Sequence, residues 1–303
     1  MTFCILMSAY NGEKYIEEQL DSIFSQEAPD VEIKVLIRDD GSADGTIEIC
    51  ENYAKDHNVD IQVIKGKNVG AAASFLELIN DCPLYDYYAF CDQDDVWLPG
   101  KVLASTQKLN NEAPVMWASN YDVVDADRKV LQEHVLDQPE TDPFRILFYN
   151  NVPGCVMVFN KALMQEMKKL ELREFRMHDI FALNMAALFG TIIFEPQSYV
   201  LYRQHGDNAL GFGNKKIKIR SWLGDKIKYL NSHEDYHFVD YSSKILDMDK
   251  SRLTSDQAKQ FAVIQNYKAG LSSTIRLLRS EYTHDGINRT GISIRMKILL
   301  HRM

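Results

Sequence analysis

The chain lacks the features that would place it in a membrane or outside the cell. None of its 303 residues belongs to an apolar run near the roughly 20 residues that a membrane span requires. The opening residues, MTFCILMSAYNG, contain neither a basic leader nor a cleavage site, so no secretory signal is expected. The five cysteines are scattered without a CxxC pair, which is typical of reduced thiols in a cytosolic protein. We therefore predict a cytoplasmic protein.

Two common phosphate-binding signatures are also missing. The sequence contains no GxGxxG turn and no GxxxxGK[ST] loop, and the tripeptide GFG at 211–213 is too short to replace either. These absences argue against a dinucleotide site of the Rossmann type and against a Walker-type phosphate loop.

The body of the chain has no excess of positive charge. Residues 1–214 carry a net charge of −17 and residues 215–303 a net charge of +8, which together give the −9 of the whole chain. A general nucleic-acid binder would carry the positive field on its body, so no nucleic acid is expected as a partner. The basic tail could meet the anionic inner face of a membrane, or it could be a solvated helical face.

The chain does contain a regular alternation of two patterns. Strand-like apolar runs alternate with helically spaced apolar residues in the order 3–9, 16–24, 31–37, 47–54, 61–64, 75–79 and 87–91. This β-α-β-α order predicts an α/β fold with a mostly parallel central sheet and helices on both faces. In such sheets ligands bind beyond the carboxyl ends of the strands.

Polar clusters follow three of these strands, at Tyr10–Gly12, Asp39–Ser42 and Asp92–Asp95. We expect the three clusters to share one rim of the sheet. Charges buried without a partner are costly, so the aspartates at the end of YYAFCDQDD should face something positive. Carboxylates are suitable ligands for Mg²⁺ or Mn²⁺, ions that also bridge to the phosphates of a substrate. The rim therefore suggests a site for a metal-bound nucleotide diphosphate.

A D-x-D sequence alone is weak evidence, because this chain contains it three times. The copy at Asp125–Asp127 follows a strand-like run and is expected in a turn. The copy at Asp247–Asp249 lies in the helical tail and is expected on a solvated face. Only the copy at Asp92 combines a buried strand with a second aspartate cluster on an earlier strand.

Seven stretches in a fixed order carry a family resemblance: ILMSAYNGEKYIEEQLDSIFSQ, LIRDDGSADGT, NVGAAASF, FCDQDDVWLPGKV, VPGCVMVFNKAL, MHDIFAL and LYRQHGDNALG. With them the chain resembles the inverting family 2 glycosyltransferases of the GT-A fold, particularly the bacterial rhamnosyltransferase-like members. The resemblance implies a GT-A catalytic domain at 1–213, divided into a nucleotide-sugar half at 1–112 and an acceptor half at 113–213. Residues 214–303 would form a basic helical C-terminal extension.

The resemblance also implies a nucleotide pocket. Ser8, Tyr10 and Glu13 would line it, with Tyr10 packing on the base or ribose. Asp39 would accept a hydrogen bond from N3–H of uracil or thymine. A β-turn at Asp39–Ser42 is the plainer interpretation, and both can hold together.

The next polar segment, NVGAAASF, would lie close to the nucleotide through Asn68 and Gly70. A cap on the following helix is the alternative role for Asn68.

The metal-binding pair of the resemblance is Asp92 with Asp94. Asp92 would face the ribose and Asp94 would coordinate the Mg²⁺ or Mn²⁺ that bridges the two phosphates. Asp95 could instead cap the helix near Lys101, and Trp97 is expected in the core.

The resemblance places the catalytic base at Asp179, in the sequence MHDIFAL. A helix cap is the alternative role for this residue, and His178 is the next candidate base. Gly154 and Cys155 would lie near the incoming sugar, and Cys155 is not expected to be a nucleophile.

In LYRQHGDNALG, Arg203 would contact the diphosphate bidentately and His205 would be the third metal ligand. Alternatively, His205 is an ordinary surface histidine that binds no metal.

These roles predict a metal-dependent transferase for surface polysaccharide synthesis. It would move a sugar from dTDP-rhamnose or a UDP-hexose to a hydroxyl of a glycan or lipid-linked acceptor. YYAFCDQDDV also fits the nucleophile motif of haloacid-dehalogenase-type phosphohydrolases, with Asp92 attacking phosphate, but three strand-like runs precede it here. A non-catalytic nucleotide- or carbohydrate-binding module would be expected to have lost Asp94 or Asp179.

The tail contains two further patterns. TSDQ at 254–257 is a capping box, and apolar residues then recur at steps of three and four from Phe261 to Tyr282, which predicts one long amphipathic helix. The segment ISIRMKILLHRM at the end of the sequence is short, apolar and basic. We expect these helices to contact a membrane peripherally, to form a homodimer, or to pack on the catalytic domain.

Overall fold

The computed structural model describes residues 1–110, 112–204, 236–248, 250–283, 295 and 298–299. The chain divides into two compact units, one made of Met1–Ile146 and Asn150–His205 and the other of Leu147–Tyr149 and Gly206–Met303. The predicted boundary between residues 213 and 214 lies outside the described residues.

The first half of unit 1 follows the predicted alternation of strands and helices. Its elements are β1 (Thr2–Ala9), α1 (Ile16–Phe24), β2 (Glu32–Asp39), α2 (Thr46–His57), β3 (Asp60–Lys65), α3 (Ala71–Asp81), β4 (Tyr87–Asp92), β5 (Val96–Trp97) and α4 (Lys101–Lys108). Each of the four strands and three helices expected between residues 3 and 91 is therefore present.

The remaining elements of the sheet region come from residues 113–203. They are β6 (Val115–Val124), β7 (Val130–Gln132), α5 (Pro143–Tyr149), the 3₁₀ turn η1 (Gly154–Val156), β8 (Met157–Asn160), α6 (Lys161–Lys168), α7 (His178–Phe189) and β9 (Thr191–Arg203). The expected strand and turn around Asp125 are the end of β6 and its connection to β7.

One sheet joins both halves, in the order β3-β2-β1-β4-β8-β6-β9-β5, with β7 paired to β6. Strands β1 to β4 are parallel, and β6 and β9 are parallel to each other. The short β8 is antiparallel to both β4 and β6, so β6 points the same way as β4. The predicted mostly parallel sheet is thus confirmed, with the short strands β5, β7 and β8 reversed among the described residues.

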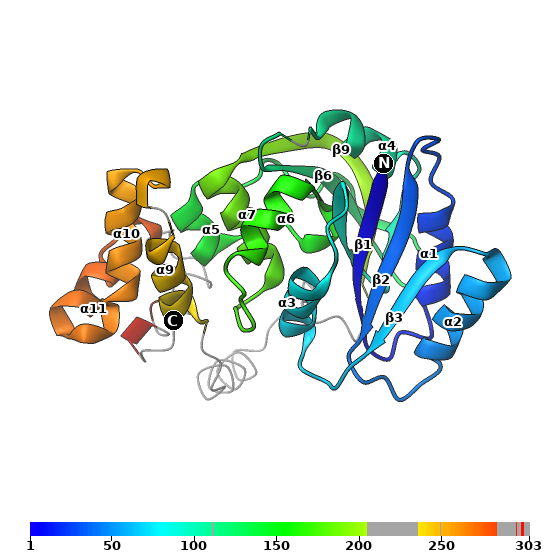
Figure 1. The fold of residues 1–303 in the computed structure, drawn as a ribbon, viewed down its shortest axis with the longest axis horizontal. Coiled ribbons are helices and arrows are strands. Elements are labelled where there is room, and N and C mark those ends of the chain that lie inside the picture. The colour runs from blue at the N-terminus through cyan, green and yellow to red at the C-terminus, as the bar shows by residue number, and fades with distance from the viewer. Residues whose placement is uncertain (111, 205–235, 249, 284–294, 296–297, 300–303) are drawn as a thin grey trace. The chain divides into compact units, whose positions relative to one another are not determined.

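Helices cover both faces of this sheet, as predicted. Figure 1 shows α1 and α2 on one face and α3, α6 and α7 on the other. The apolar stripe of α1, formed by Ile16, Leu20 and Ile23, is fully buried. Nearly every residue of α7 is buried, which is why its sequence is apolar on all sides.

The carboxyl ends of β1, β2 and β4 meet at one rim. Ser8 pairs with Asp92 in the β1–β4 ladder, and Ala9 pairs with Asp39 in the β1–β2 ladder. The register therefore places the polar segments that follow these strands side by side, as the sequence predicted.

Unit 2 is helical in its described part. It contains α9 (Phe238–Asp247), η2 (Lys250–Arg252), α10 (Ser255–Gln265), η3 (Tyr267–Ala269), α11 (Leu271–Leu278) and η4 (Glu281–Thr283). The capping box is confirmed, because Thr254 Oγ1 accepts from Gln257 N and Gln257 Oε1 accepts from Thr254 N.

The prediction of one long helix from Phe261 to Tyr282 is wrong. The chain leaves the helix after Gln265, and α11 begins only after Gly270, whose backbone is extended. Glycine is a poor helix former, and the spacing of apolar residues continued across the break without revealing it. None of the described helices is long and apolar enough to cross a membrane. Most of the final ISIRMKILLHRM segment lies outside the described residues.

Candidate active site

The first polar side chain of the rim is Asp39, at the end of β2. Its Oδ2 accepts hydrogen bonds from Gly41 N and Ser42 N, both at 3.0 Å, so the predicted turn is present. Its Oδ1 is buried and has no hydrogen-bond partner among the described residues. A buried carboxylate oxygen without a partner is costly, which makes Asp39 a candidate acceptor for a ligand N–H.

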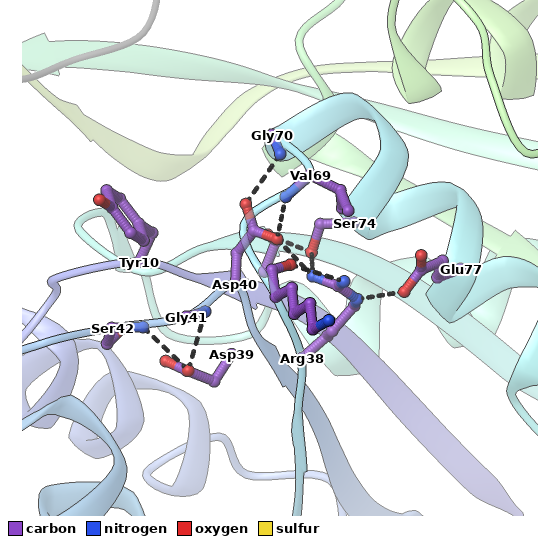
Figure 2. Close-up of polar contacts among 12 residues, drawn as sticks. Tyr10, Arg38, Asp39, Asp40, Gly41, Ser42, Val69, Gly70, Ser74 and Glu77 are labelled. Atoms are coloured by element: carbon purple, nitrogen blue, oxygen red, sulfur yellow. Dashed lines mark hydrogen bonds and ion pairs between the residues drawn. The ribbon is translucent and has the colours of Figure 1, made fainter.

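The neighbouring Asp40 differs from Asp39 in being fully occupied. Its carboxylate accepts from Val69 N and Gly70 N, both at 2.9 Å, and from Arg38 Nη1 at 2.6 Å (Figure 2). The buried Arg38 also donates through Nε to Glu77, which lies on α3. This network attaches the start of α3 to the end of β2 and leaves Asp40 no role in recognising a base.

The start of α3 is capped in a different way from the one expected. Gly70 is the residue at the N-cap position of α3, and its φ of 84° is one that residues with a side chain rarely adopt. Asn68 is exposed and makes no cap hydrogen bond, so its predicted alternative role as a helix cap is wrong. The Asp40 carboxylate meets the N–H groups of this segment instead. A contact between Asn68 or Gly70 and a nucleotide stays a prediction.

Three predicted pocket residues follow or end β1. Tyr10 is 48% exposed, and Figure 2 shows its side chain beside the end of β2 that carries Asp39. Ser8 Oγ donates to Ser74 Oγ on α3 at 2.7 Å. Glu13 Oε2 accepts from Gly45 N at 2.8 Å, so this carboxylate holds the start of α2.

The carboxylates at the end of β4 crowd together. Asp92 is half-buried and Asp95 is fully buried. Burial and the charges of Asp94 and Asp179 raise the pKa of Asp92 to about 7. Burial and the charges of Asp92 and Asp94 raise the pKa of Asp95 well above its usual range. Both shifts arise first from burial, which disfavours the charged carboxylate, and then from the repulsion among the neighbouring carboxylates.

The donor set at this end of β4 fits a hard cation. Ligand atoms of Asp92, Asp95 and Cys155 all lie within 4.8 Å of one another, among the groups that the described residues offer. Burial raises the pKa of the Cys155 thiol well above its usual range, so neither a thiolate ligand nor a nucleophile is expected there. Carboxylate oxygens, which Mg²⁺ and Mn²⁺ prefer, remain as ligands. The predicted ligand Asp94 is not in this group, and its role stays a prediction.

Lys101 and Trp97 pack directly beneath the cluster. The Lys101 ammonium donates to Cys155 O at 2.6 Å and lies 3.8 Å from the centre of the Trp97 ring. Burial lowers the pKa of Lys101 to about 8. Trp97 is in the core, as expected. The expectation that Asp95 caps α4 is wrong, because Gly100 is at the N-cap and it is Gln26 Oε1 that accepts from Val102 N in the first turn.

Arg203, at the end of β9, holds the turn that carries Asp94 and Asp95. Its main-chain N donates to Asp95 Oδ1 at 3.0 Å, and its Nε donates to Asp94 O at 2.8 Å. Its other donors reach Ala126 O and Glu18. The guanidinium is buried in these contacts, and the predicted contact with a diphosphate would have to replace some of them.

Asp179 lies at the start of α7, where the resemblance placed a base. The N-cap is Met177, whose side chain makes no cap hydrogen bond. Asp179 Oδ1 accepts at 2.7 Å from Ile180 N, an N–H of the first turn, so the alternative role of Asp179 at the start of this helix is present. Its role as a base stays a prediction. Burial raises the pKa of Asp179 to about 6, even though the hydrogen bonds from Ile180 N and Asn150 act to lower it. Because Asp179 also contributes to the raised pKa of Asp92, the two carboxylates share one electrostatic environment.

His178 faces the apolar interior. Its ring stacks on Phe75 with a centroid distance of 3.8 Å and meets Phe90 edge-on at 4.7 Å. Neither ring nitrogen has a hydrogen-bond partner among the described residues. Burial lowers the pKa of His178 to about 3. An added Cβ at Gly154 would lie 2.5 Å from His178 Nε2, so glycine is what allows η1 to pack against this ring.

Of the remaining predicted residues, two are described by the structure and one is not. Asp125 Oδ1 accepts from Asp127 N and Lys129 N, which confirms the expected turn. Asp247 ends α9 and is exposed, as expected for a solvated face. His205 lies outside the described residues, and its predicted role as a metal ligand stays a prediction.

Four residues with structural roles at the rim had no role in the sequence interpretation: Arg38, Asp40, Gln93 and Lys101. Arg38 and Asp40 flank Asp39 in RDDG, and Gln93 lies within DQDD, so their positions gave a signal. No sequence pattern marked Lys101 as a buried cation.

The family assignment follows from this geometry and from comparison with known proteins. The profile of glycosyl transferase family 2 matches residues 4–210, about two thirds of the chain. The dTDP-rhamnosyl transferase RfbG of Shigella flexneri is 34% identical over 217 residues, which are 68% of this chain and 73% of that protein. The chain belongs to glycosyl transferase family 2, and it is a glycosyltransferase.

Solved structures support the fold. Residues 1–349 of TarS from S. aureus, in complex with UDP-GlcNAc, align with a TM-score of 0.58 and 17% identity over 93% of this chain and 77% of that one. The mannosyltransferase PcManGT from Pyrobaculum calidifontis, in complex with GDP-Man and Mn²⁺, aligns with a TM-score of 0.54 and 15% identity over 99% of this chain and 88% of that one. At these identities the likeness shows the GT-A fold alone.

The family assignment overturns the two alternative functions. A phosphohydrolase of the haloacid dehalogenase type would carry Asp92 on the first strand, and here it ends β4. A non-catalytic module would be expected to have lost Asp94 or Asp179, and both are present in a chain that is 34% identical to a transferase over 68% of its length.

Proposed function

We propose that the protein is a metal-dependent inverting glycosyltransferase that uses a pyrimidine nucleotide diphosphate sugar. The observation that carries this proposal is the rim itself, which combines the unpartnered Asp39 Oδ1, the carboxylates at the end of β4 and the buried Asp179. Asp39 Oδ1 would accept the N3–H of uracil or thymine. The similarity to a dTDP-rhamnosyl transferase favours dTDP-rhamnose as the donor, with a UDP-hexose as the alternative.

Asp179 would act as the base. As the acceptor hydroxyl attacks the anomeric carbon from the side opposite the diphosphate, its proton would pass to the Asp179 carboxylate. The new C–O bond forms while the bond to the diphosphate breaks, so the configuration inverts. The pKa of about 6 leaves this carboxylate ionised near neutral pH while keeping it basic enough to take a proton.

Asp92 and Asp94 would hold the divalent ion, Mg²⁺ or Mn²⁺. When bound, the ion neutralises charge that develops on the departing nucleotide diphosphate. Asp92 would also face the ribose. Arg203 would support this pair because its main-chain N and its Nε hold the Asp94–Asp95 turn. Lys101 would support it by donating to Cys155 O, next to the carboxylates.

The acceptor would be a hydroxyl of a glycan or of a lipid-linked sugar in surface polysaccharide synthesis. Within unit 2, α11 exposes 76% of Leu271 and 37% of Ile275, and Lys268 and Arg276 lie nearby in sequence and are also exposed. With the net charge of +8 on residues 215–303, this pattern fits an anionic lipid surface.

Flotation with vesicles tests the lipid contact. The protein should float with vesicles that contain anionic lipid, and added salt should release it. Flotation that is equal with neutral lipid, or absent, would leave packing or a homodimer as the role of these helices. Sedimentation would identify the dimer.

A screen of nucleotide sugars tests the proposed reaction. Purified protein would be incubated with dTDP-rhamnose, UDP-hexoses and purine nucleotide sugars such as GDP-hexoses, with Mg²⁺, with Mn²⁺ or with chelator, and release of nucleotide diphosphate would be measured. We expect release from one pyrimidine donor that depends on a divalent ion and yields an inverted linkage. Release only from purine donors would contradict the role of Asp39, and a retained configuration would contradict the role of Asp179.

A further inference from the structure

The residue between the two predicted metal ligands makes a paired contact across the rim. Gln93 lies in the turn that follows β4, between Asp92 and Asp94. Its Oε1 accepts a hydrogen bond from Tyr10 N at 2.9 Å, and its Nε2 donates to Tyr10 O at 3.0 Å. One side-chain amide therefore satisfies both main-chain polar groups of Tyr10.

These two bonds extend the pairing of β1 with β4 beyond the ends of the strands. The last main-chain pair of that ladder joins Ser8 to Asp92, and Tyr10 is two residues beyond Ser8. A neighbouring strand would offer one N–H and one C=O, and the Gln93 amide offers the same two groups. A carboxylate at this position could accept but could not donate, so it would keep only one of the bonds.

The loop around Tyr10 is shaped to receive this amide. A Cβ on Gly12 would lie 2.2 Å from Gln93 Oε1, so a larger residue would push the amide away. On its other side the loop is fastened to the segment after β2, because Asn11 N donates to Ser42 Oγ at 2.9 Å. Tyr10 is therefore held through its main chain while its ring stays accessible.

We propose that Gln93 is a positioning residue for nucleoside recognition, which acts by fixing the main chain of Tyr10 at the rim. The inference rests on the proposed function, in which Tyr10 packs on the base or ribose. The D-Q-D sequence then serves two parts of one ligand. Its aspartates serve the ion and the ribose, and its middle residue serves the aromatic platform. A loop fixed before binding saves the entropy of ordering it, so losing the contact should weaken binding rather than chemistry.

The substitution Gln93→Met tests this role, because methionine keeps the length of the side chain and removes both hydrogen bonds. Gln26→Met is the matched control. Gln26 follows α1, and its Nε2 donates at 3.0 Å to Leu98 O, in the segment between β5 and α4. Both variants lose amide contacts to the main chain, but only the first loses them at the rim.

Two measurements distinguish the variants. Hydrogen exchange in the ligand-free protein should speed up at the Tyr10 amide in Gln93→Met and stay unchanged there in Gln26→Met. Calorimetry should show affinity for UDP and dTDP reduced roughly tenfold in Gln93→Met, about the cost of ordering one residue, and by a similar factor in Mg²⁺ and in chelator. Turnover at saturating donor should stay within about threefold of wild type, because the contact supports binding.

Contrary outcomes are specific. Gln93→Met that binds both nucleotides as wild type does, or that leaves exchange at Tyr10 unchanged, would overturn the inference and leave the proposed function standing. A loss confined to Mg²⁺ would also overturn it, because Gln93 would then act through the ion. Wild-type protein that binds neither UDP nor dTDP would overturn the inference and the proposed function together.

Discussion

The ends of β2 and β4 share one rim, but their carboxylates have different surroundings. Those of β2 accept hydrogen bonds from protein donors, and those of β4 lie mainly beside other carboxylates. At the end of β2, Asp40 accepts two main-chain N–H groups and an arginine, and Asp39 accepts two N–H groups with a single oxygen left over. At the end of β4, Asp92 and Asp95 lie close together, and burial and mutual repulsion raise their pKa values.

The difference shows which of the two groups of carboxylates has its hydrogen-bond acceptors satisfied by the described protein groups. The β2 end is satisfied except for one acceptor, which suits a neutral partner that brings one N–H. At the β4 end, burial and the repulsion among Asp92, Asp94 and Asp95 raise the pKa values of Asp92 and Asp95, which suits a cation. In the proposed function the β2 end recognises a base and the β4 end takes up an ion. Substitutions at the two ends should separate these tasks from each other and from proton transfer.

The largest effect is expected at Asp179, which we assign to neither end. Asp179→Asn keeps an oxygen for the hydrogen bond from Ile180 N but cannot take a proton. Turnover should fall roughly 10²- to 10⁴-fold, the usual contribution of a positioned base. Affinity for the donor should hardly change. Calorimetry with the donor, together with kcat, measures both quantities.

A turnover for Asp179→Asn within a few-fold of wild type would place the base elsewhere. His178 would be a poor replacement, because burial lowers its pKa to about 3 and its ring is enclosed by Phe75 and Phe90. The variant His178→Phe would show whether any proton transfer depends on it.

Asp94→Ala tests the β4 end. Loss of a metal ligand beside a diphosphate should remove about 3 kcal/mol of transition-state stabilisation, or roughly a hundredfold in turnover. Binding of nucleotide diphosphate should also lose its response to Mg²⁺. Asp127→Ala is the matched control, because it removes an exposed aspartate from another D-x-D copy. Full turnover of Asp94→Ala in excess chelator would contradict the metal role.

A pair of variants tests the β2 end. Asp39→Asn can keep an oxygen for the turn but presents an amide donor to the ring N3–H, so affinity for UDP or dTDP should fall by about 2 kcal/mol, roughly 30-fold. Asp40→Asn removes the buried charge beside Arg38 and should instead lower the free energy of unfolding. Calorimetry and urea denaturation on both variants separate the effects. Equal losses of donor affinity would contradict the division between the two aspartates.

The fold could be predicted from the sequence where local pattern and tertiary packing agree. The strands that end in Ala9 and Asp92 are nearly continuous apolar runs, and the strand that ends in Asp39 has an apolar centre. A parallel sheet places the ends of all three strands together. The tail was harder. Apolar spacing continued from Phe261 past Gly270 as though one helix ran through, because periodicity reports which residues are apolar and not where the backbone turns.

The sequence predicted where the polar segments of the site lie, but it did not predict the partners of the individual side chains. The order of the strands placed Asp39 at the rim, and the family resemblance gave Asp179 as the base. Neither could show that Asp40 is occupied by Val69 and Gly70. Nor could they show that the guanidinium of Arg203 is buried among main-chain oxygens. Such pairings depend on the direction of each side chain across the sheet, which spacing along one strand does not determine.

The smallest effect is expected beneath the β4 end, where His178 packs against Phe90. Burial lowers the pKa of His178 from 6.5 to about 3. Above pH 6.5 the ring is neutral in both folded and unfolded chains and adds no pH dependence. Between the two values the unfolded chain binds a proton that the folded chain does not, so this stability falls as the pH falls. From pH 7 to pH 5.5 the loss should be about 1 kcal/mol.

Urea denaturation should show that extra loss in wild type and not in His178→Phe. Parallel pH dependences in the two proteins would mean that water reaches this ring, and that the packing under the carboxylates is less apolar than the raised pKa of Asp92 requires.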